Sequence, residues 1–139
     1  MEDRTPRRLA LGLATVLALL VAALTAQGEV ATTPMVVKIH ADWCGTCTRL
    51  EPTFEALEQE VGSGARIVVL DVTDKEAVAR SAAEAERLGI QGFFDSYKGK
   101  TGTVGVLTAD GKPVSVMKGE LDVSKYVAAL EKAREAPTT

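Results

Sequence analysis

The chain has few of the residue types that perform covalent or metal chemistry. Its 139 residues include only two cysteines and one histidine, and aromatic residues make up 4% of the sequence. It also lacks an excess of positive charge: the formal net charge is −3 and no basic face is apparent, which excludes a nucleic-acid-binding surface. Any covalent redox chemistry must therefore use the two cysteines.

The start of the chain differs in composition from the rest. Arginines precede an uncharged stretch, Leu9 to Gln27, that is rich in Leu, Ala and Val. A basic segment followed by an apolar run is typical of an export signal or a membrane anchor. Residues 9–26 are at the short end of the roughly 20 residues that span a bilayer, so cleavage and anchoring both stay open. We predict a signal peptide or membrane anchor over 1–27 and an exported domain over 28–139, located in the cell envelope.

The two cysteines form a Cys-x-x-Cys motif at Cys44 and Cys47. The motif follows the strand-like run 35–39 and precedes a helical repeat of apolar residues over 50–61. The unpaired N–H groups and positive dipole end of a helix N-terminus stabilise a thiolate. A bridge across so short a loop removes little entropy from the unfolded chain, so we predict a redox pair rather than a structural disulfide, with Cys44 as the nucleophile.

Strand-like and helix-like segments alternate along the rest of the chain. In order, we expect a strand over 35–39, a helix over 48–61, a strand over 67–70, a helix over 75–88 and strands over 104–107 and 114–117. A last helix begins with Asp122 or Ser124 as its cap, and the charged tail 131–139 frays. The wholly apolar run 67–70 suits a strand buried on both faces of a parallel pair. The Asp110-Gly111 pair is a hairpin signal. This order predicts an α/β domain with a central mixed sheet.

This order, together with the segment Ala41–Cys47, resembles the thioredoxin family, and the match covers about residues 33–133. The resemblance implies a thioredoxin-like fold with a central mixed sheet, a terminal antiparallel hairpin and flanking helices. It also implies that Cys44 is exposed as the attacking thiolate and that Cys47 is more buried as the resolving thiol. The residues expected to shape the site or bind substrate are Trp43, Gly45, Thr46, Thr103 and Gly119.

The predicted function is a thiol–disulfide oxidoreductase that exchanges disulfides with partner proteins and needs no organic cofactor. A membrane redox protein would supply or accept the electrons. The alternative is a metal-binding or metal-delivery module, since Cys44, Cys47 and His40 suit Cu(I) or zinc. We favour a structural ring for His40, because the thiolate already has a helix terminus. A redox-inactive adaptor is disfavoured by the presence of both cysteines.

The sequence departs from the thioredoxin pattern at several positions. Lys38 stands where the family has a buried acid that is implicated in proton transfer to the resolving thiol, and we expect its stem to pack while its ammonium reaches solvent. Thr103 stands at the family's cis-proline, and a non-proline cis bond costs about 3 kcal/mol, so we expect a trans bond there. Thr46 also replaces a proline. The aromatic segment 92–99 reads as a loop, for which packing is favoured over contact with a partner.

Overall fold

The structure is a computed structural model that describes residues 33–137. The predicted signal peptide or anchor over 1–27 and the domain boundary at residue 28 lie outside these residues and stay predictions. Within the described part of the chain, no helix is both long and apolar enough to cross a membrane.

Four strands form one mixed sheet in the order β2-β1-β3-β4. Their bounds are β1 Met35–His40, β2 Arg66–Asp71, β3 Thr103–Leu107 and β4 Pro113–Lys118. The central strand β1 pairs in parallel with β2 and antiparallel with β3. Strands β3 and β4 form the predicted hairpin, and Gly111 in its turn has a φ of +86°, a conformation that favours glycine. The expected mixed sheet with a terminal antiparallel hairpin is confirmed.

The helices are α2 Gly45–Val61, α3 Lys75–Arg87, α4 Gln91–Tyr97 and α5 Val123–Glu135, and a 3₁₀ turn over Gly62–Gly64 follows α2. Asp74 and Asp122 cap α3 and α5 by accepting hydrogen bonds from backbone N–H groups in the first turn of each helix. The prediction that the tail frays from Glu131 onward is wrong for residues 131–135, which continue helix α5. The last turns of α5 bury Leu130 and Ala133 against the core, which holds this end of the helix in place.

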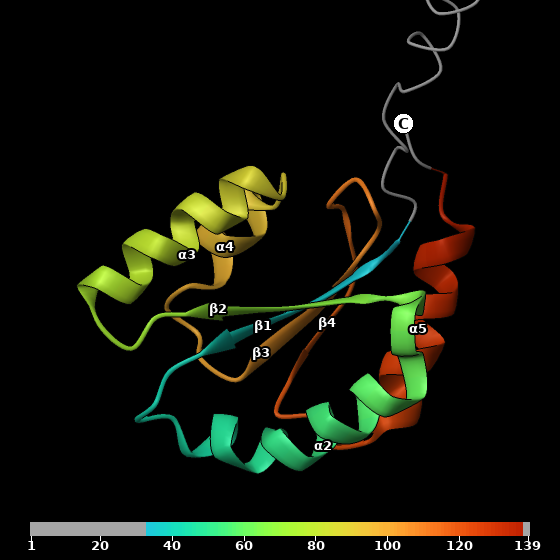
Figure 1. Ribbon diagram of the computed structural model, residues 1–139, viewed down its shortest axis with the longest axis horizontal. Coiled ribbons are helices and arrows are strands. Elements are labelled where there is room, and N and C mark those ends of the chain that lie inside the picture. The colour runs from blue at the N-terminus through green and yellow to red at the C-terminus, as the bar shows by residue number, and fades with distance from the viewer. Residues whose placement is uncertain (1–32, 138–139) are drawn as a thin grey trace, which may run out of the picture. The chain divides into compact units, whose positions relative to one another are not determined.

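Helices cover both faces of the sheet (Figure 1). Helices α3 and α4 lie on one face, and α2 and α5 lie on the other. Side chains of β1 alternate between the two layers, because successive residues of a strand point to opposite faces. Val37 and Ile39 pack with the α3 and α4 side, whereas Val36 packs with the α2 and α5 side. The central strand is therefore buried on both faces.

Strand β2 is an edge strand, and one of its faces is only partly covered. Val68 and Leu70 are buried, but Val69 between them is 52% exposed. The prediction that 67–70 is buried on both faces is therefore wrong. An apolar run does not specify whether a strand lies at the centre or at the edge of a sheet, and only the strand order decides that.

The aromatic segment 92–99 forms most of the short helix α4 rather than a loop. Phe93 and Phe94 are buried in the core beside α3, and the rings of Phe93 and Tyr97 lie 4.8 Å apart. The packing role is confirmed, and the loop is corrected to a helix. Gly105 in β3 makes room for this packing, because a Cβ there would lie 2.6 Å from Phe93 Cζ and 2.8 Å from Leu107 Cδ1.

We predict that Gly105→Ala destabilises the fold by about 1–3 kcal/mol, the usual cost of overpacking a filled core. Gly92→Ala on α4 is the matched control: a Cβ there meets no atom within 4 Å, so its stability should equal or slightly exceed that of the wild type. Chemical denaturation measures both free energies of unfolding. Equal stability of the two variants would contradict the packing described for Phe93.

Candidate active site

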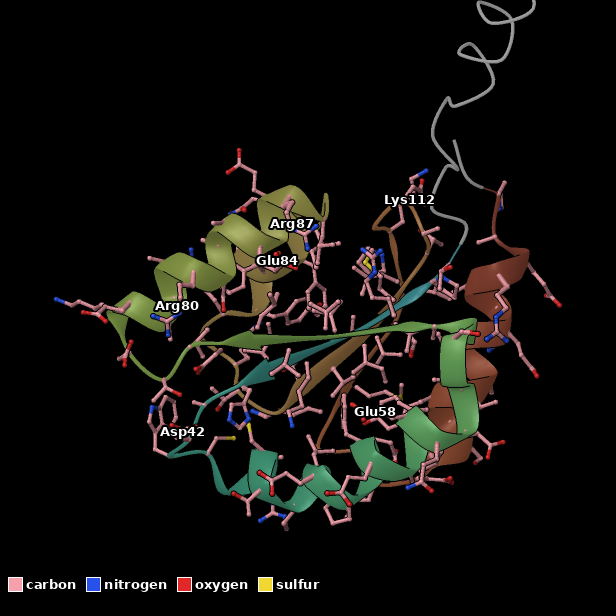
Figure 2. The ribbon with its side chains drawn as sticks, viewed as in Figure 1. Asp42, Glu58, Arg80, Glu84, Arg87 and Lys112 are labelled. Carbon is pink, nitrogen blue, oxygen red and sulfur yellow. The ribbon has the colours of Figure 1, made fainter. Side chains whose placement is uncertain are left out.

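The two cysteines lie where β1 ends and α2 begins. Cys44 is the N-cap residue of α2, and its Sγ accepts a hydrogen bond from the backbone N–H of Cys47 at 3.2 Å. The backbone N–H of Cys44 in turn donates to the carbonyl of Ala41 at 3.0 Å, which closes the turn before the helix. Figure 2 labels Asp42, which lies in the turn between β1 and α2, two residues before Cys44. The first turn of α2 contains no acidic side chain that would repel a thiolate.

Both sulfurs are buried, to different degrees. Cys47 is fully buried, and its Sγ lies 3.7 Å from the carbonyl oxygen of Ile39. Cys44 is 7% exposed. The expectation that Cys47 is the more buried thiol is confirmed, but the expected exposure of Cys44 is wrong. Segments distant in sequence cover it, since a Cβ on Gly102 would lie 3.9 Å from Cys44 Sγ.

Hydrogen bonds favour the thiolate at Cys44. Burial alone would raise the pKa of this thiol, and it is the largest single influence. Hydrogen bonds from the Cys47 thiol and the Thr101 hydroxyl oppose it, as do those from the backbone N–H groups of Cys47 and Thr46. Together these donors lower the pKa of Cys44 below its ordinary value, because each stabilises negative charge on the sulfur.

The environment of Cys47 has the opposite effect. Burial raises the pKa of this thiol most strongly, and its hydrogen bond to Cys44 raises it further. A hydrogen bond with the backbone of Ala41 and the positive charge of Lys38 lower the pKa, but they do not outweigh these effects. The pair therefore contains one thiol whose pKa is lowered and one whose pKa is raised, although the two are only three residues apart at the start of α2.

Thr46 fills the space where two glycines approach the motif. A Cβ on Gly102 would lie 2.7 Å from Thr46 Cγ2, and a Cβ on Gly119 would lie 3.1 Å from the same methyl. Gly102 and Gly119 both have positive φ, and the N–H of Gly119 donates to the carbonyl of Gly102 at 3.0 Å. The structure thus brings together Thr46 and Gly119, which the sequence assigned to the site.

Trp43 is anchored on the loop after β2 and remains 67% exposed. Its indole N–H donates to the carbonyl of Thr73 at 3.1 Å, and the Thr73 hydroxyl accepts from the backbone N–H of Asp42 at 3.0 Å. Thr73 in turn donates to the Asp71 carboxylate through both its N–H and its hydroxyl, and these bonds lower the pKa of Asp71. Gly45 lies on the surface with no atom within 4 Å of an added Cβ, so no steric contact there requires glycine.

A family model described as thioredoxin matches residues 20–93, which is more than half of the chain. This chain belongs to the thioredoxin family. Thioredoxin H-type from Chlamydomonas reinhardtii is 34% identical over 104 residues, covering 75% of this chain and 84% of that protein. Thioredoxin X, chloroplastic, from Arabidopsis thaliana is 32% identical over 92 residues, covering 66% and 42%.

Solved structures share the same fold. The thioredoxin of Fasciola hepatica superposes with a TM-score of 0.51 at 22% identity, over 84% of this chain and 93% of that chain. The exposed lipoprotein thioredoxin of Streptococcus pneumoniae gives a TM-score of 0.53 at 15% identity, over 75% and 87%. With the Cys44-x-x-Cys47 motif in place, the chain is a thioredoxin-family thiol–disulfide oxidoreductase.

Lys38 departs from the family pattern and from our expectation. It is 5% exposed, and its Nζ lies 4.8 Å from the centre of the Phe54 ring on α2. The ammonium therefore does not extend into solvent as expected. The negative face of the aromatic ring partly balances the charge of the ammonium, which explains how the chain accommodates a lysine at this buried position.

Thr103 begins β3 and is 3% exposed. No peptide bond within residues 33–137 is cis, so the expectation of a trans bond is confirmed. The N–H of Thr103 donates to the carbonyl of Lys100 at 3.3 Å, and both backbone groups of Gly102 are bonded to Ile39 and Gly119. The backbone N–H of Thr103 is therefore already bonded and is not an open donor, and its role in the site stays a prediction.

His40 pairs with Asp42 rather than completing a metal site. Its Nε2 lies 3.2 Å from Asp42 Oδ1, while Nδ1 is buried without a hydrogen-bond partner among the described residues. Across residues 33–137, no three His, Cys, Asp or Glu side chains converge in a way that could hold a metal ion. The three-ligand set of Cys44, Cys47 and His40 is therefore not assembled in this structure.

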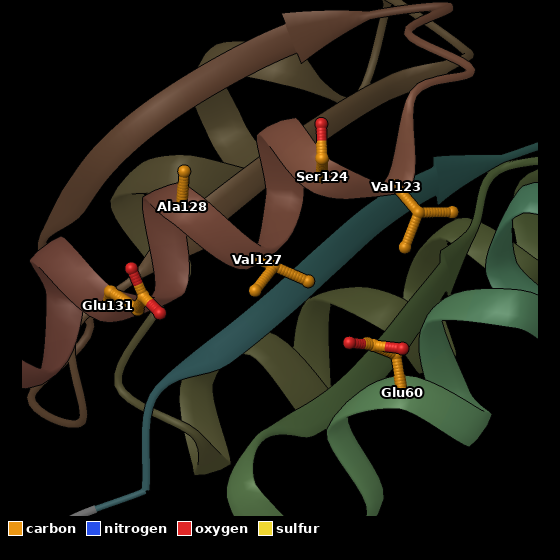
Figure 3. Close-up of a pocket in the computed structure, with 6 residues that line it drawn as sticks. All are labelled: Glu60, Val123, Ser124, Val127, Ala128 and Glu131. Atoms are coloured by element: carbon orange, nitrogen blue, oxygen red, sulfur yellow. The ribbon is translucent and has the colours of Figure 1, made fainter.

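A separate hollow of about 400 Å³ lies between the end of α2 and α5 (Figure 3). Its lining residues are Glu60, Val123, Ser124, Val127, Ala128 and Glu131. It is at the opposite end of α2 from the cysteines, so the thiol site is distinct from this hollow.

Sequence reasoning missed Thr101, Gly102 and Thr73. The Thr101 hydroxyl lowers the pKa of Cys44, a Cβ on Gly102 would meet Thr46, and the carbonyl of Thr73 accepts from the Trp43 indole N–H. None of them is near the motif in the chain, and no local pattern marks them. Only Gly102 itself offered a weak signal, because a glycine often marks a place where the backbone closely approaches another segment.

We predict that Thr101→Val raises the pKa of Cys44, because it removes one hydroxyl donor from the thiolate. Alkylation of the reduced protein by iodoacetamide should slow at neutral pH, and its rate profile should move to higher pH. Thr101→Ser keeps the hydroxyl and should behave like the wild type. An unchanged profile in Thr101→Val would remove this hydrogen bond from the account.

Proposed function

We propose that this protein is a cell-envelope oxidoreductase that reduces or oxidises protein disulfides, with Cys44 as the attacking thiolate and Cys47 as the resolving thiol. The observation that supports it most directly is the asymmetry of the pair. Hydrogen bonds at the N-terminus of α2 lower the pKa of Cys44, whereas burial raises that of Cys47. A nucleophile must be ionised to attack, and a resolving thiol should stay protonated until the mixed disulfide has formed.

In the reductive direction, the Cys44 thiolate attacks one sulfur of a partner disulfide. The Cys44–partner bond forms, the partner's own disulfide breaks, and its second sulfur leaves as a thiolate. Cys47 then loses its proton and attacks Cys44 Sγ, which forms the Cys44–Cys47 disulfide and releases the first partner sulfur. The partner gains two electrons and the protein loses two. The oxidative direction reverses these steps with the same atoms.

The proposed location rests on the arginines and the apolar stretch 9–26. Outside the cytoplasm, the Cys44–Cys47 disulfide has to be reduced again, or the dithiol reoxidised, before the next turnover. A membrane redox protein is the class of partner that supplies or removes these electrons. Partner proteins would approach beside the exposed Trp43, which offers an apolar contact next to the motif.

We predict that Cys47→Ser traps a mixed disulfide between Cys44 and a model protein disulfide, visible on a non-reducing gel. Cys44→Ser should trap none, and both variants should lose catalytic turnover. Each serine differs from cysteine by one atom, so the two variants are matched controls for one another. A wild type that reduces no disulfide, together with a Cys47→Ser protein that traps nothing, would overturn the exchange mechanism.

We predict that residues 1–32 direct export. Fused to a reporter enzyme that is active only outside the cytoplasm, they should give activity, and the same fusion without residues 9–26 should give none. Mass measurement of the full-length product then distinguishes a cleaved signal from a retained anchor. Equal reporter activity with and without residues 9–26 would refute the envelope location.

A further inference from the structure

Trp43 is the most exposed of the large hydrophobic side chains in residues 33–137, yet its ring is bonded at one end. The side chain is 67% exposed, and an exposed indole without a partner samples several rotamers. Here the indole N–H donates to the carbonyl of Thr73 at 3.1 Å, which restricts those rotamers. The bond therefore restrains the ring beside Cys44, the next residue in the chain.

The carboxylate of Asp71 orients Thr73. Its Oδ1 accepts from the backbone N–H of Thr73 at 2.9 Å and from the Thr73 hydroxyl at 2.6 Å. A hydroxyl has a single proton, so this donation leaves the Thr73 oxygen as an acceptor, and the backbone N–H of Asp42 donates to it at 3.0 Å. Because the last acceptor is a charged carboxylate, the hydrogen bonds that lead to it are strengthened.

The hydrogen bonds of Thr73 hold the turn and the ring together. The backbone of Asp42 and the indole of Trp43 both belong to the turn between β1 and α2, and both bond to this one threonine. The N–H of Val72 donates to the carbonyl of His40 at 2.8 Å, which joins the two segments just before the turn. The side chain that orients Thr73 therefore also sets where the Trp43 ring lies.

We propose that Asp71, acting through Thr73, is a positioning residue for partner binding that holds Trp43 as a preformed contact beside Cys44. The proposal rests on thiol exchange with protein partners and identifies the residue that prepares the contact. A contact that is already ordered binds more tightly, because less conformational entropy is lost when the partner arrives. Within residues 33–137 the Asp71 carboxylate bonds to Thr73 and to neither sulfur, so it is not a catalytic residue.

The nucleophile does not depend on these hydrogen bonds. The groups that lower the pKa of Cys44 belong to the first turn of α2 and to Thr101, and none belongs to segment 71–73. Loss of the Asp71 carboxylate should therefore weaken partner binding and leave the reactivity of Cys44 as it is. Binding and reactivity can be measured separately in the same variants.

The test compares variants of the full chain. Asp71→Ala removes the acceptor, Asp71→Asn keeps an oxygen acceptor in nearly the same shape, and Thr73→Val removes only the hydroxyl. Thr108→Val is the matched control: the Thr108 hydroxyl also donates to a carboxylate two residues away, that of Asp110, and accepts from the N–H of Lys112 at 3.0 Å. It follows β3 at the end of the sheet where β1 begins, away from the thiols.

Trp43 is the only tryptophan of the chain, so the decay of fluorescence anisotropy measures the motion of this ring alone. Asp71→Ala and Thr73→Val should add fast local motion and raise KM for a model protein disulfide about two- to tenfold, the usual cost of ordering one side chain. Their kcat and the alkylation rate of Cys44 by iodoacetamide should match the wild type. Asp71→Asn and Thr108→Val should match the wild type in every measurement.

A double-mutant cycle tests whether Asp71 acts through the ring. Once Trp43→Ala is present, Asp71→Ala should raise KM no further, because the side chain that it positions is gone. Chemical denaturation establishes that each variant is folded. If Asp71→Ala fails to fold, Thr73→Val replaces it in the cycle.

An unchanged KM in the folded variants, with or without a more mobile ring, would refute the positioning role while thiol exchange stands. Additive effects of Asp71→Ala and Trp43→Ala on KM would also refute it, since the carboxylate would then act independently of the ring. If the wild type does not turn over the protein disulfide at all, the proposed function itself fails.

Discussion

The hydrogen bond from the backbone N–H of Cys47 to Cys44 Sγ is the interaction on which the site depends. It exists because Cys44 is the N-cap of α2, and α2 begins there because β1 ends and the chain turns at Ala41. The central strand, buried on both faces, fixes that point in space. The sheet, the turn and the helix together convert a local sequence motif into two thiols with different pKa values.

Burial and hydrogen bonding then set the pKa values of the two thiols. Neither sulfur is open to solvent, so dehydration works against ionisation at both. At Cys44, several donors from α2 and the Thr101 hydroxyl outweigh it, and at Cys47 they do not. Lys38 adds a cation where thioredoxins carry an acid. The chemistry of thiol exchange is thus shared with the family.

The sequence predicted the parts of the fold and site that have local signals. The Cys44-x-x-Cys47 motif lies at a strand–helix junction, and Asp110-Gly111 marks a hairpin, because short-range geometry determines both. The parts it could not predict depend on contacts across the chain. The exposure of Val69 follows from strand order, the cover over Cys44 comes from a distant loop, and α4 is too short to show a helical period. The final position of the Lys38 ammonium depends on a ring presented by another element.

The most direct test of the central claim is competitive alkylation of the reduced wild-type protein. Limiting iodoacetamide at neutral pH, followed by peptide mass spectrometry, measures how fast each thiol reacts in the same molecule. The account predicts that Cys44 is modified first and that Cys47 is modified only when the fold is opened by denaturant. Equal modification of the two thiols, or faster modification of Cys47, would contradict the asymmetry that α2 and its N-cap impose.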